Sequence, residues 1–173
     1  RRKRKAALSY ANLAIVRSLS KAYALAGIRL GYLIANFEVI TEMMKVRQPY
    51  SVDSFSALAG LAALEAKEQM LRNVGLMIAQ RQRVQEALRA MAGVRVFASD
   101  ANFLLFSVPG ASAIWQQLYD CYGILVRDFS ATPGLRDCLR VSIGTAEEID
   151  EFLLALTALL AEAEMTTQAE KDQ

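Results

Sequence analysis

Residues 18–32 read SLSKAYALAGIRLGY, and this stretch contains the most informative pattern in the chain. Two hydroxyl side chains, Ser18 and Ser20, precede the lone lysine Lys21, and Arg29 follows eight positions later. Lysine amines form Schiff bases with carbonyl compounds, and the planar donors of arginine suit a phosphate group. The pattern therefore indicates an amine nucleophile beside a bound phosphate.

Pyridoxal phosphate carries both an aldehyde and a phosphate, so it is the cofactor that this pattern favours. The stretch resembles the Schiff-base segment of class I/II (fold type I) aminotransferases, roughly S-x-S-K-x-(F/Y)-x-x-x-G-x-R-x-G-(Y/W). Within that family it is most similar to the histidinol-phosphate aminotransferases. The resemblance continues to about Leu160 through four further blocks, which are QPYSV at 48–52, DANFLLF at 100–106, VRD at 126–128 and CLRVSIG at 138–144.

The resemblance implies roles for the four polar residues of the stretch. Lys21 is expected to form the Schiff base and to move a proton from the substrate Cα. Ser18, Ser20 and Arg29 are expected to contact the cofactor phosphate. On spacing alone, an ordinary surface lysine after a strand, with a polar turn around it, is the alternative interpretation.

Two downstream arginines, Arg127 and Arg140, are expected to bind the substrate. An arginine within the apolar strand LRVS needs a partner, and Arg140 matches the family residue that pairs with a substrate anion. Arg127 matches a second arginine that histidinol-phosphate aminotransferases direct at the substrate phosphate. The alternative for Arg127 is a salt bridge to Asp128 or Asp137.

Periodicity predicts alternating strands and helices. An apolar run at 13–16 indicates a buried strand, with a second at 28–35, while Asp53 is placed to cap a helix. Further predicted helices cover about 68–91 and 111–122, and Thr145 with Glu148 forms a capping box for the last one. The remaining predicted strands lie at 94–97, 103–107, 124–126 and 138–142.

These elements indicate an α/β fold. We expect the C-terminal part of a fold type I large domain, as a parallel-sheet remnant over 1–53, followed by a small α+β domain over 54–163 and a frayed tail over 164–173. The family's carboxylate for the pyridine nitrogen and its stacking ring belong upstream of this resemblance. We therefore expect a truncated chain that is a weak catalyst, or inactive, by itself.

Composition narrows the function classes further. The chain is 54% hydrophobic and 22% charged, which is typical of a globular protein, and it has no histidine, which excludes Ser/His and Cys/His catalysis within it. Five basic residues lie at positions 1–5, and the rest holds 15 basic and 18 acidic residues. That run indicates a solvated end rather than a nucleic-acid tail, because no aromatic pattern accompanies it.

No apolar run reaches the about 18 residues of a membrane span, and two cysteines are too few for a disulfide framework. We expect the full-length parent to be a cytoplasmic homodimer, and dimerisation of this chain by itself stays open. The expected partners are small molecules, namely an amino acid or amino phosphate ester and a 2-oxo acid, without nucleic acid, membrane or metal. Transfer between histidinol phosphate and 2-oxoglutarate is the leading hypothesis. The alternatives are an aromatic-amino-acid aminotransferase, a threonine-phosphate decarboxylase and an inert fragment.

Overall fold

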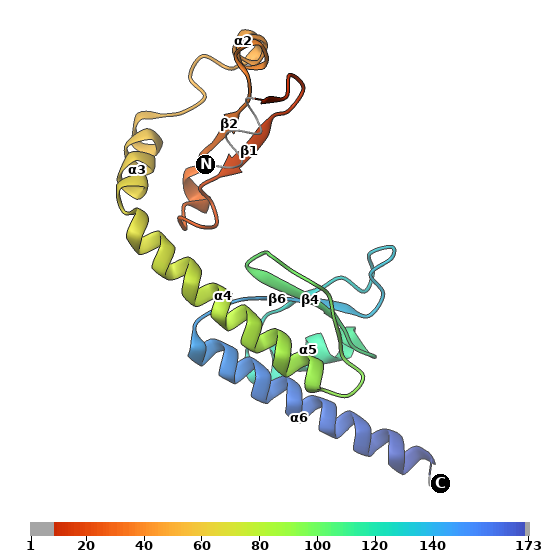
Figure 1. Ribbon diagram of the computed structural model, residues 1–173. Coiled ribbons are helices and arrows are strands. Elements are labelled where there is room, and N and C mark those ends of the chain that lie inside the picture. Colours follow the sequence, from red (N-terminus) through yellow and green to blue (C-terminus); the bar gives the residue numbers. More distant parts are fainter. Residues whose placement is uncertain (1–8, 172–173) are drawn as a thin grey trace. The chain divides into compact units, whose positions relative to one another are not determined.

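The computed structural model describes residues 9–171, and the basic run at positions 1–5 lies outside the described residues. The chain divides into two compact units, the first ending at Val74 and the second beginning at Gly75 (Figure 1). Helix α4 (Lys67–Ala90) contains this boundary. Each unit has its own sheet.

The first unit is built on two short antiparallel strands, β1 (Ile15–Ser18) and β2 (Gly31–Ile34). The prediction of a parallel pairing is wrong for these strands. Residues 19–30 join them through turns and the 3-10 helix η1 (Ala26–Ile28), not through the helix that a parallel crossover requires. The predicted burial of the first strand is also wrong, since Val16 is 74% exposed.

Two capped helices follow in the first unit. The sequence patterns did not predict α2 (Phe37–Val46), although the Asn36 side chain caps it by accepting a hydrogen bond from the Val39 N–H at 2.9 Å. Asp53 caps α3 (Ser54–Glu65) as predicted. Large apolar side chains are exposed along both helices, namely Phe37, Met43, Met44, Val46, Phe55, Leu58, Leu61 and Leu64.

The second unit holds a four-stranded antiparallel sheet in the order β3-β4-β6-β5. The strands are β3 (Arg95–Val96), β4 (Phe103–Ser107), β5 (Arg127–Asp128) and β6 (Cys138–Ser142).

Helices cover one face of this sheet. They are α5 (Ala111–Tyr122), α6 (Ala146–Lys171) and the part of α4 after Gly75 (Figure 1). Alternate strand residues point into the core between sheet and helices, among them Leu104, Phe106, Leu139 and Val141.

Local hydrogen bonds explain where prediction and structure agree or differ in this unit. Thr145 and Glu148 exchange hydrogen bonds at the start of α6, which confirms the capping box. The prediction of a strand at 124–126 is wrong. The Ile124 N–H donates to the Leu118 carbonyl and the Val126 carbonyl accepts from the Trp115 indole N–H, and both of these partners belong to α5. Helix α6 continues to Lys171, past its predicted end near Glu164.

Candidate active-site residues

The β1–β2 hairpin brings the polar residues of the stretch at 18–32 to one end. Ser18 lies opposite Gly31 in the last ladder pair, and the Leu19 N–H donates to the Leu30 carbonyl at 3.1 Å just beyond it. Ser20 and Arg29 are therefore the next residues on the two arms of the loop, and Lys21 follows Ser20. The predicted phosphate contacts and the predicted lysine therefore lie at one end of the hairpin, in the loop at 19–30 and at the last residue of β1.

Backbone contacts fix the shape of the loop at 19–30. The Leu25 N–H donates to the Leu19 carbonyl at 3.3 Å, and the Ala24 N–H donates to the Lys21 carbonyl at 3.1 Å. Ala24 and Arg29 both have left-handed backbone conformations, with φ of 55° and 57°. Such conformations are costly for residues with a side chain and cluster at functional sites. The loop is thus a closed, strained turn.

The side chains of the loop combine hydroxyl, guanidinium and amine donors. Ser18 Oγ accepts a hydrogen bond from the Ser20 N–H at 3.0 Å, which leaves its own proton available. Arg29 Nη1 donates to the Ala26 carbonyl at 2.9 Å, so the guanidinium is held over the loop with further N–H groups free to donate. The Lys21 side chain is exposed. This donor set fits a phosphate beside an aldehyde.

Helix α3 supports the loop through a face of small residues. Ser56 and Gly60 are buried, one turn apart. A Cβ placed on Gly60 would overlap the Leu30 side chain and lie 3.8 Å from Leu19 Cδ1. Leu19 and Leu30 are the first and last residues of the loop, and we call this apolar pair the neck of the loop. Because α3 packs against the neck, it packs against the base of the candidate site.

The second group of candidate residues lies on the sheet of the second unit. Arg127 on β5 and Arg140 on β6 are direct register partners, on the sheet face opposite the core. The Arg140 guanidinium carbon lies 5.1 Å from the centre of the Phe103 ring. Phe129 contacts both cations, at 5.1 Å from Arg127 and 6.0 Å from Arg140.

The carboxylates nearest in sequence are engaged elsewhere. Asp128 accepts hydrogen bonds from the Ser112 hydroxyl and the Ser130 N–H, both at 2.7 Å. Asp137 Oδ2 lies 3.6 Å from Arg136 Nε, within ion-pair distance. Among the residues that the structure describes, no salt bridge involves Arg127 or Arg140, so the alternative interpretation of Arg127 is wrong.

Arg140 also has an unsatisfied donor. Its Nε is buried and has no hydrogen-bond partner within the described part of the chain. A buried, unpaired donor on a cation is costly, and a bound anion would relieve it. Two neighbouring guanidiniums to which the described residues supply no counterion are therefore suited to an anion of more than one negative charge.

Comparison with known proteins decides the family. The family model described as aminotransferase class I and II matches residues 4–156. The chain belongs to the class I and II aminotransferases. Histidinol-phosphate aminotransferases of Ruminiclostridium cellulolyticum and Yersinia pseudotuberculosis are 39% and 41% identical to it, each over 87% of its length. The chain spans only 42% and 40% of those two relatives.

Solved aminotransferase structures confirm the fold class. The histidinol-phosphate aminotransferase from Clostridium acetobutylicum matches with a TM-score of 0.79 and 26% identity, over 89% of this chain and 47% of that one. That from Sinorhizobium meliloti, solved in complex with pyridoxal-5'-phosphate, matches with a TM-score of 0.78 and 25% identity, over 92% and 44%. This aminotransferase chain therefore has a partial fold type I architecture.

The aminotransferase stretch meets the chemical requirements of pyridoxal phosphate. Ser18, Ser20 and Arg29 offer neutral and charged donors to its phosphate, and Lys21 offers the amine to its aldehyde. Gly31 lets the strands approach closely there, since its Cβ would lie 2.7 Å from the Arg17 carbonyl oxygen. The residues present thus fit the cofactor of the family.

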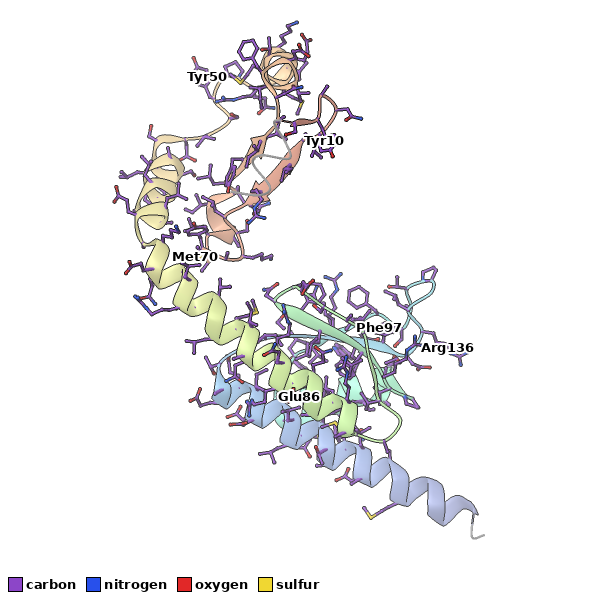
Figure 2. The ribbon with its side chains drawn as sticks, viewed as in Figure 1. Tyr10, Tyr50, Met70, Glu86, Phe97 and Arg136 are labelled. Atoms are coloured by element: carbon purple, nitrogen blue, oxygen red, sulfur yellow. The ribbon has the colours of Figure 1, made fainter. Side chains whose placement is uncertain are left out.

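Sequence reasoning missed the aromatic partners of the arginines. Phe129 and Phe103 contact the predicted substrate residues, yet neither was singled out. An available signal was the spacing Arg127-x-Phe129, because residues two apart in extended backbone share a face. The same spacing recurs in Arg95-x-Phe97, which begins on β3 and ends one residue past it (Phe97 is labelled in Figure 2). None of the helices in the part that the structure describes has the length and apolarity to cross a bilayer.

Proposed function

We propose that this chain provides the lysine-bearing and substrate-binding part of a pyridoxal-phosphate-dependent aminotransferase. The reaction is transfer of the amino group of L-histidinol phosphate to 2-oxoglutarate, which gives glutamate and the ketone derived from histidinol phosphate. The two histidinol-phosphate aminotransferase relatives, near 40% identity, support this substrate pair. The working enzyme is a cytoplasmic homodimer, with residues 1–53 in its large domain and 54–163 in its small domain.

The loop at 19–30 would hold the cofactor and carry the proton. Ser18, Ser20 and Arg29 would hold its phosphate by donating hydrogen bonds, and Lys21 would hold its aldehyde carbon through Nζ. When bound, the cofactor supplies an electron sink for the bond electrons left at the substrate Cα. The free Lys21 amine then acts as a general base, removing the Cα proton.

The facing pair Arg127 and Arg140 is the observation that carries the choice of substrate. Within residues 9–171 neither guanidinium has a carboxylate partner, which leaves two positive charges for one ligand. A phosphate ester carries about −1.5 to −2 charges at neutral pH, whereas a carboxylate carries only one. This pairing therefore favours a phosphorylated substrate over an aromatic amino acid.

A phosphorylated substrate is also compatible with decarboxylation of threonine phosphate, so the assay needs two readouts. The protein is tested at the full length encoded by its gene, with pyridoxal phosphate. Glutamate release is measured with histidinol phosphate or phenylalanine as amino donor, and carbon dioxide release with threonine phosphate.

We expect glutamate from histidinol phosphate at least about tenfold faster in kcat/KM than from phenylalanine, and no carbon dioxide. Arg127→Gln should remove most of that preference. Equal rates with phenylalanine, or carbon dioxide release, would replace the proposal with one of its alternatives. If no reaction occurs and pyridoxal phosphate does not bind, the alternative of a catalytically inert fragment would replace the proposal.

A further inference from the structure

Phe129 occupies an unusual place, because one ring contacts two cations. Its centre lies 5.1 Å from the guanidinium carbon of Arg127 and 6.0 Å from that of Arg140. These arginines are directly opposed on neighbouring strands, where like charges destabilise a sheet. The face of an aromatic ring carries partial negative charge and attracts both cations.

An aromatic ring and a carboxylate would leave different numbers of arginine charges and N–H donors available to a bound anion. A carboxylate between Arg127 and Arg140 would neutralise one charge and occupy the N–H donors that an incoming anion needs. The Phe129 ring attracts the same cations through its face while their in-plane donors stay available. The ring thus offsets part of the repulsion between the two guanidiniums, and no carboxylate among the described residues occupies their N–H donors.

The ring is held on a fixed section of backbone. The Phe129 N–H donates to the Cys138 carbonyl at 2.9 Å, and the Phe129 carbonyl accepts from the Thr132 N–H at 2.7 Å. The preceding residue, Asp128, accepts a hydrogen bond from the Ser112 hydroxyl of α5. Phe129 is therefore placed by bonds that do not involve either arginine.

We propose that Phe129 is a positioning residue that holds Arg127 and Arg140 side by side, both charged, and so sets a preference for a phosphate dianion over a carboxylate. This inference rests on the proposed function, because it assumes that the arginine pair binds the substrate anion. Phe129 itself touches no reacting atom. Its effect acts through the two guanidiniums.

The test measures anion affinity directly, by calorimetry on the full-length protein loaded with pyridoxal phosphate so that the loop at 19–30 is filled. The probes are methyl phosphate and acetate. In Phe129→Leu, which keeps an apolar side chain but removes the ring, methyl phosphate should bind about five- to tenfold more weakly, with a smaller change for acetate. Phe129→Tyr keeps the ring and should bind as the wild type does.

Phe97→Leu is the matched control. It makes the same substitution on the same face of the sheet, at a ring that contacts Arg95 instead. It should leave methyl phosphate affinity unchanged. The pH dependence gives a second readout: wild-type affinity for methyl phosphate should fall below about pH 6, where the dianion is protonated, and this fall should be shallower in Phe129→Leu.

The outcomes separate the two proposals. If Arg127→Gln and Arg140→Gln bind methyl phosphate as the wild type does, the proposed function fails. If those variants lose binding while Phe129→Leu keeps the wild-type ratio of methyl phosphate to acetate affinity, the role of Phe129 alone is overturned. A folded Phe129→Leu protein with a reduced ratio, beside an unchanged Phe97→Leu, supports it.

Discussion

The N–H of Leu19 donates to the carbonyl of Leu30 at 3.1 Å and closes the β1–β2 hairpin one pair beyond Ser18 and Gly31. This backbone bond fixes the distance between the two arms of the hairpin that carry the candidate phosphate contacts. Leu19 is also 3% exposed, and it lies with Leu30 against Gly60 of α3. Polar residues at the hairpin end are therefore held by an apolar neck.

Gly31→Ala should disturb that neck. The added Cβ would lie 2.7 Å from the Arg17 carbonyl oxygen, and a backbone atom cannot rotate away. We expect the free energy of unfolding, from urea denaturation, to fall by about 1–3 kcal/mol, with weaker binding of pyridoxal phosphate. Gly27→Ala in the same loop has open space around its Cβ and should unfold near the wild-type urea concentration. Equal midpoints for the two variants would contradict this account.

Arg140→Met should separate stability from anion binding. The change removes a buried unpaired Nε and a cation that faces Arg127. Without an anion present, we expect no loss of unfolding free energy and a gain of up to about 1 kcal/mol, while methyl phosphate binding disappears.

Arg81→Met is the comparison for that variant. Arg81 is buried, whereas Arg140 is half-buried, and Arg81 donates to the Ala101 carbonyl at 2.8 Å. Its replacement should cost about 1–3 kcal/mol, because the carbonyl loses its charged partner. A large loss in Arg140→Met, matching that in Arg81→Met, would show that Arg140 stabilises the fold instead.

The bond between Asp128 and Ser112 should make the stability of the second unit depend on pH. Burial raises the pKa of Asp128, but hydrogen bonds from Ser130 and Ser112 outweigh it and hold the pKa below the ordinary 3.8. A lowered folded pKa stabilises the fold above the ordinary pKa, and this contribution is lost as the pH falls through the folded value.

Denaturation of the wild type and Ser112→Ala at several pH values checks this. The wild-type advantage in unfolding free energy should be constant above about pH 5 and shrink below the ordinary pKa of the carboxyl. A pH-independent advantage would mean that the Ser112 hydroxyl contributes without the charge of Asp128.

Local signals explain which parts of the fold could be predicted. The Asp53 cap and the Thr145–Glu148 capping box depend on residues three apart, and both were predicted. The antiparallel pairing of β1 with β2 was missed, because an apolar run does not reveal the direction of its neighbour. The bounds of β5 were missed because Trp115, distant in sequence, bonds to the Val126 carbonyl.

The candidate site divides in the same way. Lys21 and its neighbours stand within one short motif, so their shared loop follows from the sequence. The pairing of Arg127 with Arg140 depends on the register of β5 on β6, which no single segment contains. The contact of Phe129 with both arginines requires that register as well.

The bond that we propose between Lys21 and the aldehyde of pyridoxal phosphate can be trapped by reduction. The full-length protein is incubated with the cofactor and reduced with borohydride, and the added mass is located by peptide mass spectrometry. We expect the mass on Lys21, lost in Lys21→Ala and kept in Lys45→Ala, a control at another exposed lysine. Equal labelling of Lys21 and Lys45, or none on Lys21, would contradict the account.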